Sequence, residues 1–103
     1  MSQKITVYWR DIPSQVIVKR GRNRGKAVLS QRFQEAIDDA AMKAGKAGTD
    51  DYVEEWHRTT VDIPKEGEIN EQAFALAEEY EKAYPDERLK ALVSSGGADE
   101  ENA

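Results

Sequence analysis

Five cationic side chains lie close together between positions 19 and 26 of the sequence. They are Lys19, Arg20, Arg22, Arg24 and Lys26. A cluster of this density, at the end of a strand and in a turn, is typical of a surface that binds phosphate groups or other anions. The same side chains could instead remain in solvent, or could neutralise acidic helices of the same chain. The sequence leaves both interpretations open.

Two glycine motifs near this cluster resemble nucleotide-binding loops. The first runs from Gly21 to Lys26, but it has three residues between its glycines where a phosphate loop has four, and Ala27 stands where Ser or Thr would hold magnesium. The second, Gly45 to Gly48, has the GxxG pattern of KH domains, which clamp nucleotide backbones. The acidic residues that follow it, from Asp50 to Glu55, would repel phosphate. We expect no nucleotide hydrolysis at the first motif and no KH-type nucleotide binding at the second.

No combination of residues in the sequence assembles a catalytic centre. His57 is the only histidine and the chain has no cysteine, which excludes thiol nucleophiles and thiolate metal sites. Glu54 and His57 have the spacing of only half a two-metal carboxylate site. The acidic pairs at 38–39 and 78–79 fall on helical faces that we expect to meet water. The sequence therefore predicts a protein that is not an enzyme and that has no metal or cofactor.

The elements that position these residues begin with a β-hairpin. Residues 5–10 alternate between apolar and polar types, which predicts a strand, and the turn signals of residues 11–14 predict a chain reversal. Residues 15–20 are rich in β-branched side chains and predict the returning strand, followed by a short third strand at 26–29. A later β-branched segment, 58–63, predicts an edge strand of the same sheet.

Helical patterns follow the hairpin. An amphipathic helix is predicted from the N-cap Ser30 to Gly45, and a short helix at 50–56. Asn70 is the predicted N-cap of a second long helix, and a last short helix is expected at 85–93. The predicted apolar stripe of the second long helix consists of Ala73, Phe74, Ala77, Tyr80 and Tyr84. These elements predict an α+β fold, in which a small antiparallel sheet packs against two main amphipathic helices.

Length and composition are those of one small domain. Of the 103 residues, 39% are hydrophobic and 34% are charged, which is enough apolar material for one core. We expect this domain to span residues 1–93 and a disordered acidic tail to occupy 94–103. No apolar run reaches the roughly 18 residues of a membrane span, and the lack of cysteine fits a reducing compartment. We therefore expect no membrane partner and a cytoplasmic location.

The charge is divided unevenly along the chain. Residues 1–34 contain eight Lys or Arg and one acidic residue, so this part carries a charge of +7. The remaining residues carry −12, which gives the net charge of −5. Such asymmetry indicates either an anion-binding face or two halves that dock on each other in the fold.

The segment around the first predicted turn resembles the bacterial virulence factor domain family. The resemblance covers roughly residues 4–93. Its strongest matches are Trp9, Arg10, Asp11, Ile12, Pro13, Gln15 and Val16. The resemblance implies a cytoplasmic bacterial protein, in some cases the first module of a larger virulence factor with helical repeats. It implies no catalytic residues, and it associates genes of this family with neighbouring genes of cobalamin and folate methyl transfer.

Three functional hypotheses follow. The leading one is a non-enzymatic accessory module that binds a protein partner. The alternative is a nucleic-acid or phosphate-ligand binder that uses the cations of residues 19–26. The third is an accessory subunit of an enzyme complex, for example one of cobalamin or folate methyl transfer, in which Arg10, Asp11 and Gln15 complete the active site of another protein.

Overall fold

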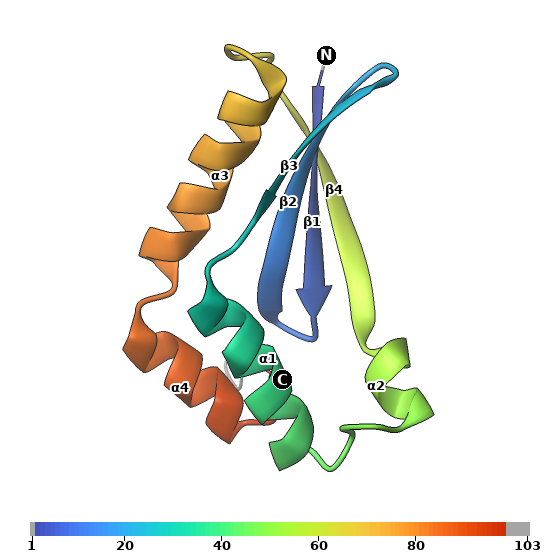
Figure 1. Ribbon diagram of the computed structural model, residues 1–103, viewed down its shortest axis with the longest axis vertical. Helices are drawn as coiled ribbons and strands as arrows, with labels where there is room; N and C mark the ends of the chain where they lie inside the picture. The colour runs from blue at the N-terminus through green and yellow to red at the C-terminus, as the bar shows by residue number, and fades with distance from the viewer. Residues whose placement is uncertain (1, 99–103) are drawn as a thin grey trace.

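The fold is a four-stranded antiparallel sheet with helices packed on it, as seen in a computed structural model that describes residues 2–98 (Figure 1). The strand order is β3-β2-β1-β4. The strands are β1 (Ser2–Trp9), β2 (Ile12–Arg20), β3 (Asn23–Val28) and β4 (Trp56–Ile63). The helices are α1 (Gln31–Lys43), α2 (Asp50–Glu54), α3 (Ile69–Ala83) and α4 (Asp86–Ser94). The predicted α+β class is confirmed.

The turn of the first hairpin is shorter than the sequence predicts. Only Arg10 and Asp11 separate β1 from β2, and Arg10 has a φ of 52°. The prediction of a turn over 11–14 is wrong, because Pro13 lies inside β2 opposite Tyr8. The pairing register between β1 and β2 shifts between Val7 and Tyr8. A strand can accommodate a proline at such an irregularity.

The two outer strands also differ from their predicted limits. β3 begins at Asn23, three residues before the predicted start, because it pairs with β2 directly after the turn at Gly21 and Arg22. β4 begins at Trp56 and pairs with β1 as an edge strand, which confirms the predicted edge position.

The N-terminal cap of α3 is Glu68, and the prediction of Asn70 as the cap is wrong. The Glu68 carboxylate accepts hydrogen bonds from the backbone N–H groups of Asn70 and Glu71, each at 2.9 Å. These bonds hold the pKa of Glu68 below its usual value. Phe74 also departs from the predicted apolar stripe, because its side chain is 61% exposed.

The core lies between the helices and one face of the sheet. α3 runs along β3 and β2, and α1 packs against β2 and α4 (Figure 1). The side chains of Trp9, Ile12 and Phe33 are fully buried in this core. Gly25 lets β3 approach the start of α3, because a Cβ at this position would lie 2.7 Å from the carbonyl oxygen of Ile69.

The chain after α4 returns to the first hairpin turn. Gly96 and Gly97 are buried, and the backbone N–H of Asp11 donates to the Gly97 carbonyl at 2.9 Å. The Arg10 guanidinium donates to the Gly96 carbonyl at 3.0 Å. The predicted start of the tail, at Ser94, is therefore too early in the sequence, because residues 94–98 are part of the packed structure. Residues 99–103 of that predicted tail lie outside the described residues.

Candidate functional site

The two faces of the sheet differ in what covers them. On one face, the Tyr80 hydroxyl of α3 hydrogen-bonds to Thr6 of β1 at 2.9 Å. The opposite face carries a small cluster of Ile5, Val7 and Ile17, each 8–9% exposed, with Trp56 packed against it. Neighbouring strand residues point to opposite faces, so the side chains next in sequence to the helix-covered positions belong to the open face.

Four cations lie on this open face. Lys19 is paired with Arg24, Lys26 with Ile17, and Arg58 with Val7, so all of them share the face of the Ile5 cluster. Within residues 2–98, none of these cations forms an ion pair. We call Lys19, Arg24, Lys26 and Arg58 the basic sheet face. Arg58, which comes from β4, was not among the predicted site residues because it lies far from the cationic hairpin in sequence.

The predicted cationic cluster is divided by the fold. Arg20 faces the helix side, where its guanidinium donates to the Gly67 carbonyl at 2.8 Å and to the Gln72 side-chain oxygen at 2.6 Å. It therefore anchors the loop before α3. Arg22 lies exposed in the turn at the end of the hairpin. The structure thus brings together Lys19, Arg24 and Lys26 on the open face and places the Arg20 side chain on the other face, although Arg24 also borders the hollow beside Arg20.

A hollow of about 700 Å³ lies beside Arg20. Arg24 and Lys65 contribute to its lining, together with Glu68. The Arg20 Nε is buried and has no hydrogen-bond partner in the described part of the chain. This hollow is the place where the structure comes nearest to the predicted phosphate site, although the Glu68 carboxylate opposes an anion there.

The residues of the predicted family motif hold the first turn in place. The Trp9 indole N–H donates to the Tyr52 carbonyl at 2.9 Å, and Arg10 pairs with Glu55 at 3.0 Å. Burial raises the pKa of Glu55, but the hydrogen bonds and charges of Arg10 and Lys46 outweigh it and hold this pKa below its usual value. These contacts give Arg10 a structural role.

The other motif residues do not gather into one site. Pro13 is buried in β2, whereas Gln15 is half-buried on the open face, opposite Val7 and Val28. Asp11 is held at the turn by its backbone bond to Gly97. The trio of Arg10, Asp11 and Gln15 therefore does not form one polar surface.

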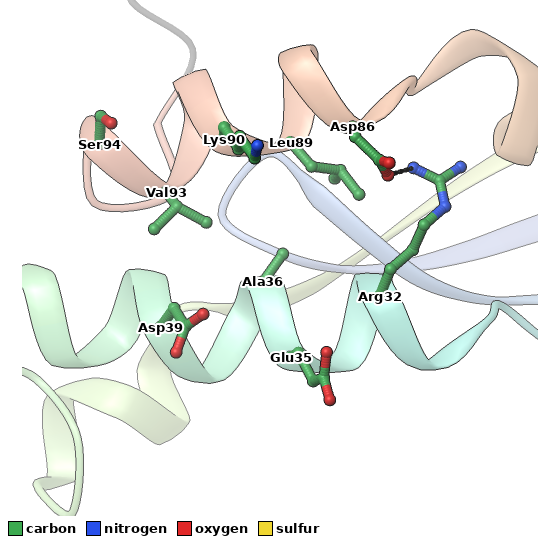
Figure 2. Close-up of a pocket in the computed structure, with 9 residues that line it drawn as sticks. All are labelled: Arg32, Glu35, Ala36, Asp39, Asp86, Leu89, Lys90, Val93 and Ser94. Atoms are coloured by element: carbon green, nitrogen blue, oxygen red, sulfur yellow. Dashed lines mark hydrogen bonds and ion pairs between the residues drawn. The ribbon is translucent and has the colours of Figure 1, made fainter.

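A second hollow, of about 450 Å³, lies between α1 and α4 (Figure 2). Ala36, Leu89 and Val93 give it an apolar floor, and Glu35 and Asp39 of α1 border it. Arg32, which also lines the hollow, is engaged by the carboxylates of Glu81 and Asp86. We assign this hollow no chemistry.

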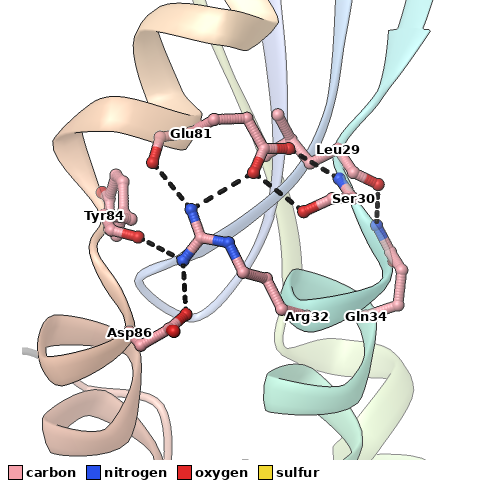
Figure 3. A network of polar contacts seen from close by, with 7 residues as sticks. All are labelled: Leu29, Ser30, Arg32, Gln34, Glu81, Tyr84 and Asp86. Atoms are coloured by element: carbon pink, nitrogen blue, oxygen red, sulfur yellow. Dashed lines mark hydrogen bonds and ion pairs between the residues drawn. The ribbon is translucent and has the colours of Figure 1, made fainter.

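Arg32 is the centre of a polar network that joins three helices (Figure 3). Its guanidinium donates to the backbone carbonyls of Glu81 and Tyr84 and contacts the carboxylates of Glu81 and Asp86, each at 3.2 Å. The Glu81 carboxylate also accepts from the backbone and hydroxyl of Ser30. The network fixes the start of α1 against the junction of α3 and α4.

Sequence reasoning missed a cluster of hydroxyl and cationic groups on the helix-covered face. Tyr80 lies 74 positions after Thr6 and 72 positions after Tyr8 in the sequence, and only the fold brings them together. The Tyr80 hydroxyl lies 2.9 Å from the Thr6 hydroxyl and 3.4 Å from the Tyr8 hydroxyl. The Lys4 ammonium lies 5.2 Å from the Tyr80 ring centroid. Burial raises the pKa of Tyr80, but the hydrogen bonds of Thr6 and Tyr8 and the charge of Lys4 bring it below the usual value.

His57 belongs to the edge of this cluster. Its ring stacks on Tyr8 with centroids 5.4 Å apart, and its Nε2 lies 2.5 Å from the Arg10 carbonyl oxygen. Because a carbonyl oxygen only accepts, Nε2 carries the proton. Among residues 2–98, no group of three or more His, Asp or Glu is arranged to hold a metal ion.

The Lys4 charge gives a direct test of this arrangement. We expect Lys4→Met to raise the pKa of Tyr80, because it removes the nearby positive charge that favours the phenolate. The matched control is Lys19→Met, which removes a lysine from the open face. A titration of tyrosine ionisation by ultraviolet absorbance measures both variants. Equal changes in the two variants, or none in Lys4→Met, would contradict the assignment.

A comparison with protein-family models shows the family to which the chain belongs. A model described as "Virulence factor" matches residues 7–93. The chain belongs to this family. The match confirms the resemblance seen in the sequence, and it includes the first hairpin turn, all four cations of the basic sheet face and the helices of the virulence factor domain up to Val93 in α4. No curated protein and no solved structure matches the chain. None of the described helices has the length and apolar character needed to cross a membrane.

Proposed function

We propose that this virulence factor domain is a non-enzymatic accessory module that binds an acidic surface of a partner protein through its basic sheet face. The observation that carries the proposal is the grouping of four cations around an apolar cluster on the face of the sheet that none of the helices within residues 2–98 covers. A protein interface combines an apolar centre with charged groups that select the partner. Val28, 58% exposed, extends the apolar part of this face.

A role without catalysis is supported by where the candidate groups lie. His57 is engaged by Tyr8 and by the Arg10 carbonyl. The acidic pair Asp38 and Asp39 is exposed on α1. A catalytic centre requires a base, a nucleophile and a place for the reacting atom within a few ångströms, and these groups lie on separate elements.

Nucleic acid is the second candidate ligand. The hollow beside Arg20 and the partly buried Trp56 next to the basic sheet face favour it, since phosphates bind cations and bases stack on aromatic rings. Against it, Tyr8 lies on the other face of the sheet and Trp9 is fully buried, so neither ring is available to bases from the basic sheet face.

The double variant Arg24→Ser/Lys26→Ser tests the proposed function. We expect it to bind an acidic peptide containing leucines about tenfold more weakly than the wild type, because two exposed charge contacts are lost. The control is Lys82→Ser/Lys90→Ser, which makes the same change in net charge on α3 and α4. Fluorescence anisotropy of the labelled peptide measures binding.

A single-stranded RNA of equal charge is the second probe. Preferred binding of RNA, with a salt dependence that falls by about one unit of slope for each cation removed, would favour the nucleic-acid alternative. Equal peptide binding by the wild type and the double variant would contradict the proposed function.

A further inference from the structure

β4 is an edge strand with a free side. Within residues 2–98 it pairs with β1 alone, and residues 57–62 are all exposed. The other edge strand, β3, is covered by α3 (Figure 1). β4 contains no proline or lysine, two residues that commonly protect an edge from pairing with another strand, and its two charged residues, Arg58 and Asp62, are opposite in sign. β4 therefore offers a backbone that a further strand can extend.

The backbone groups on the free side can be identified. The N–H of Arg10 donates to the carbonyl of Glu55 at 3.1 Å, and these two residues continue the register of β1 and β4 by one pair. Hydrogen-bonded and non-hydrogen-bonded pairs alternate along an antiparallel ladder. His57, Thr59 and Val61 therefore bond to β1, which leaves the N–H and C=O groups of Arg58, Thr60 and Asp62 directed outward.

We propose that β4 pairs with β4 of a second copy of this chain, antiparallel, about a two-fold axis at Thr60. In this register Thr60 faces Thr60 of the partner subunit, and Arg58 faces Asp62 of the partner subunit. Arg58 and Asp62 are paired with Val7 and Gln3 of β1, so both lie on the open face of the sheet. The two-fold axis therefore makes two cross-strand ion pairs at once.

The self-complementary charges are what favour a second copy over an unrelated strand. Opposite charges that face each other across two strands stabilise the pairing, and like charges oppose it. In the two neighbouring symmetric registers, Arg58 would face Thr60 or Pro64 of the partner subunit and would lose its carboxylate. Of the β4 residues with outward backbone groups, Arg58, Thr60 and Asp62 pair with one another in the proposed register, and Trp56 lies opposite Pro64 of the partner subunit.

Charge reversal tests the pairing of Arg58 with Asp62. We expect the wild type to dimerise with rising concentration in sedimentation equilibrium, and we expect Arg58→Asp and Asp62→Arg each to raise the dimer dissociation constant at least about tenfold. When the two single variants are mixed, each acidic side chain meets a basic one, so a heterodimer should form. The double variant Arg58→Asp/Asp62→Arg should restore the homodimer. A wild type that stays monomeric at its highest soluble concentration would overturn the proposal.

Cross-linking tests the register without relying on charge. The chain has no cysteine, so Thr60→Cys introduces a single thiol. At the two-fold axis the two Cα atoms would lie about 5.5 Å apart, within the range of a disulfide. The control Thr59→Cys places its thiols on diagonal positions roughly 7–8 Å apart. We expect rapid oxidative dimerisation of Thr60→Cys only, and equal rates for both variants would overturn the register.

A last variant removes one outward donor. Thr60→Pro deletes an N–H that does not bond to β1, and proline is tolerated on an edge strand. We expect it to abolish dimers while far-ultraviolet circular dichroism remains that of the wild type. If dimers persist in this variant, the interface lies elsewhere. An unfolded variant would contradict the assignment of the Thr60 N–H to the free side.

Discussion

Replacement of Gly97 by alanine is expected to lower the free energy of unfolding by about 3 kcal/mol, the larger part from a steric clash and the rest from backbone strain. Gly97 has a φ of 95°, and a Cβ there would lie 2.7 Å from Cζ3 of Trp9. Trp9 is fully buried, so its ring cannot move aside without disturbing the core. Urea denaturation followed by tryptophan fluorescence measures the loss.

Gly48→Ala is the matched control for this experiment. Gly48 also has a positive φ, 75°, but a Cβ there meets nothing within 4 Å. Gly48→Ala should therefore lower the free energy of unfolding only by the backbone strain, about 1 kcal/mol. Equal losses in the two variants would show that Gly97 does not pack on Trp9.

Arg32→Met is expected to destabilise the fold by about 2 kcal/mol. It leaves the carbonyls of Glu81 and Tyr84 without their charged donor and removes two carboxylate contacts. The Arg32 side chain is 31% exposed, so water can replace part of the hydrogen bonding that the substitution removes. Methionine keeps most of the apolar contact of the arginine stem, which isolates the polar contribution.

The salt dependence of this loss distinguishes carbonyl bonds from ion pairs. Because two of the four contacts are to backbone carbonyls, about half of the destabilisation should persist in high salt. Arg88→Met serves as the control, since Arg88 donates to one carbonyl, that of Ala83. A loss for Arg32→Met that vanishes in high salt, or that is no larger than for Arg88→Met, would contradict the role of the network.

Periodicity predicts most of the elements, and local chemistry misplaces their ends. The alternation in the first strand and the helical spacing around Phe33 are strong repeating signals. Pro13 is a turn signal in the sequence, but a strand irregularity accommodates it in β2. Asn70 is a good cap by residue type, yet the helix begins two residues earlier, where the Glu68 carboxylate accepts from the backbone N–H groups of Asn70 and Glu71.

The candidate site was only partly predictable, because it depends on which face of the sheet the helices cover. Strand alternation separates Lys19 from Arg20 whatever the fold. Only the position of α3 decides that Arg20 is engaged and Lys19 is on the open face. Arg58 joins the basic sheet face through pairing between β1 and β4, and no local pattern indicates that partner.

The central place of β1 in the sheet has a consequence for how the chain folds. The pairings of β1 with β2 and of β2 with β3 close short loops, whereas Gln3 pairs with Asp62 only after a long intervening segment. Contacts between residues distant in sequence form slowly, because the chain must lose more loop entropy first. During synthesis, the antiparallel meander of β1, β2 and β3 can form before β4 is available, so one edge of β1 remains unpaired. We expect the nascent chain to be most prone to aggregation during this interval.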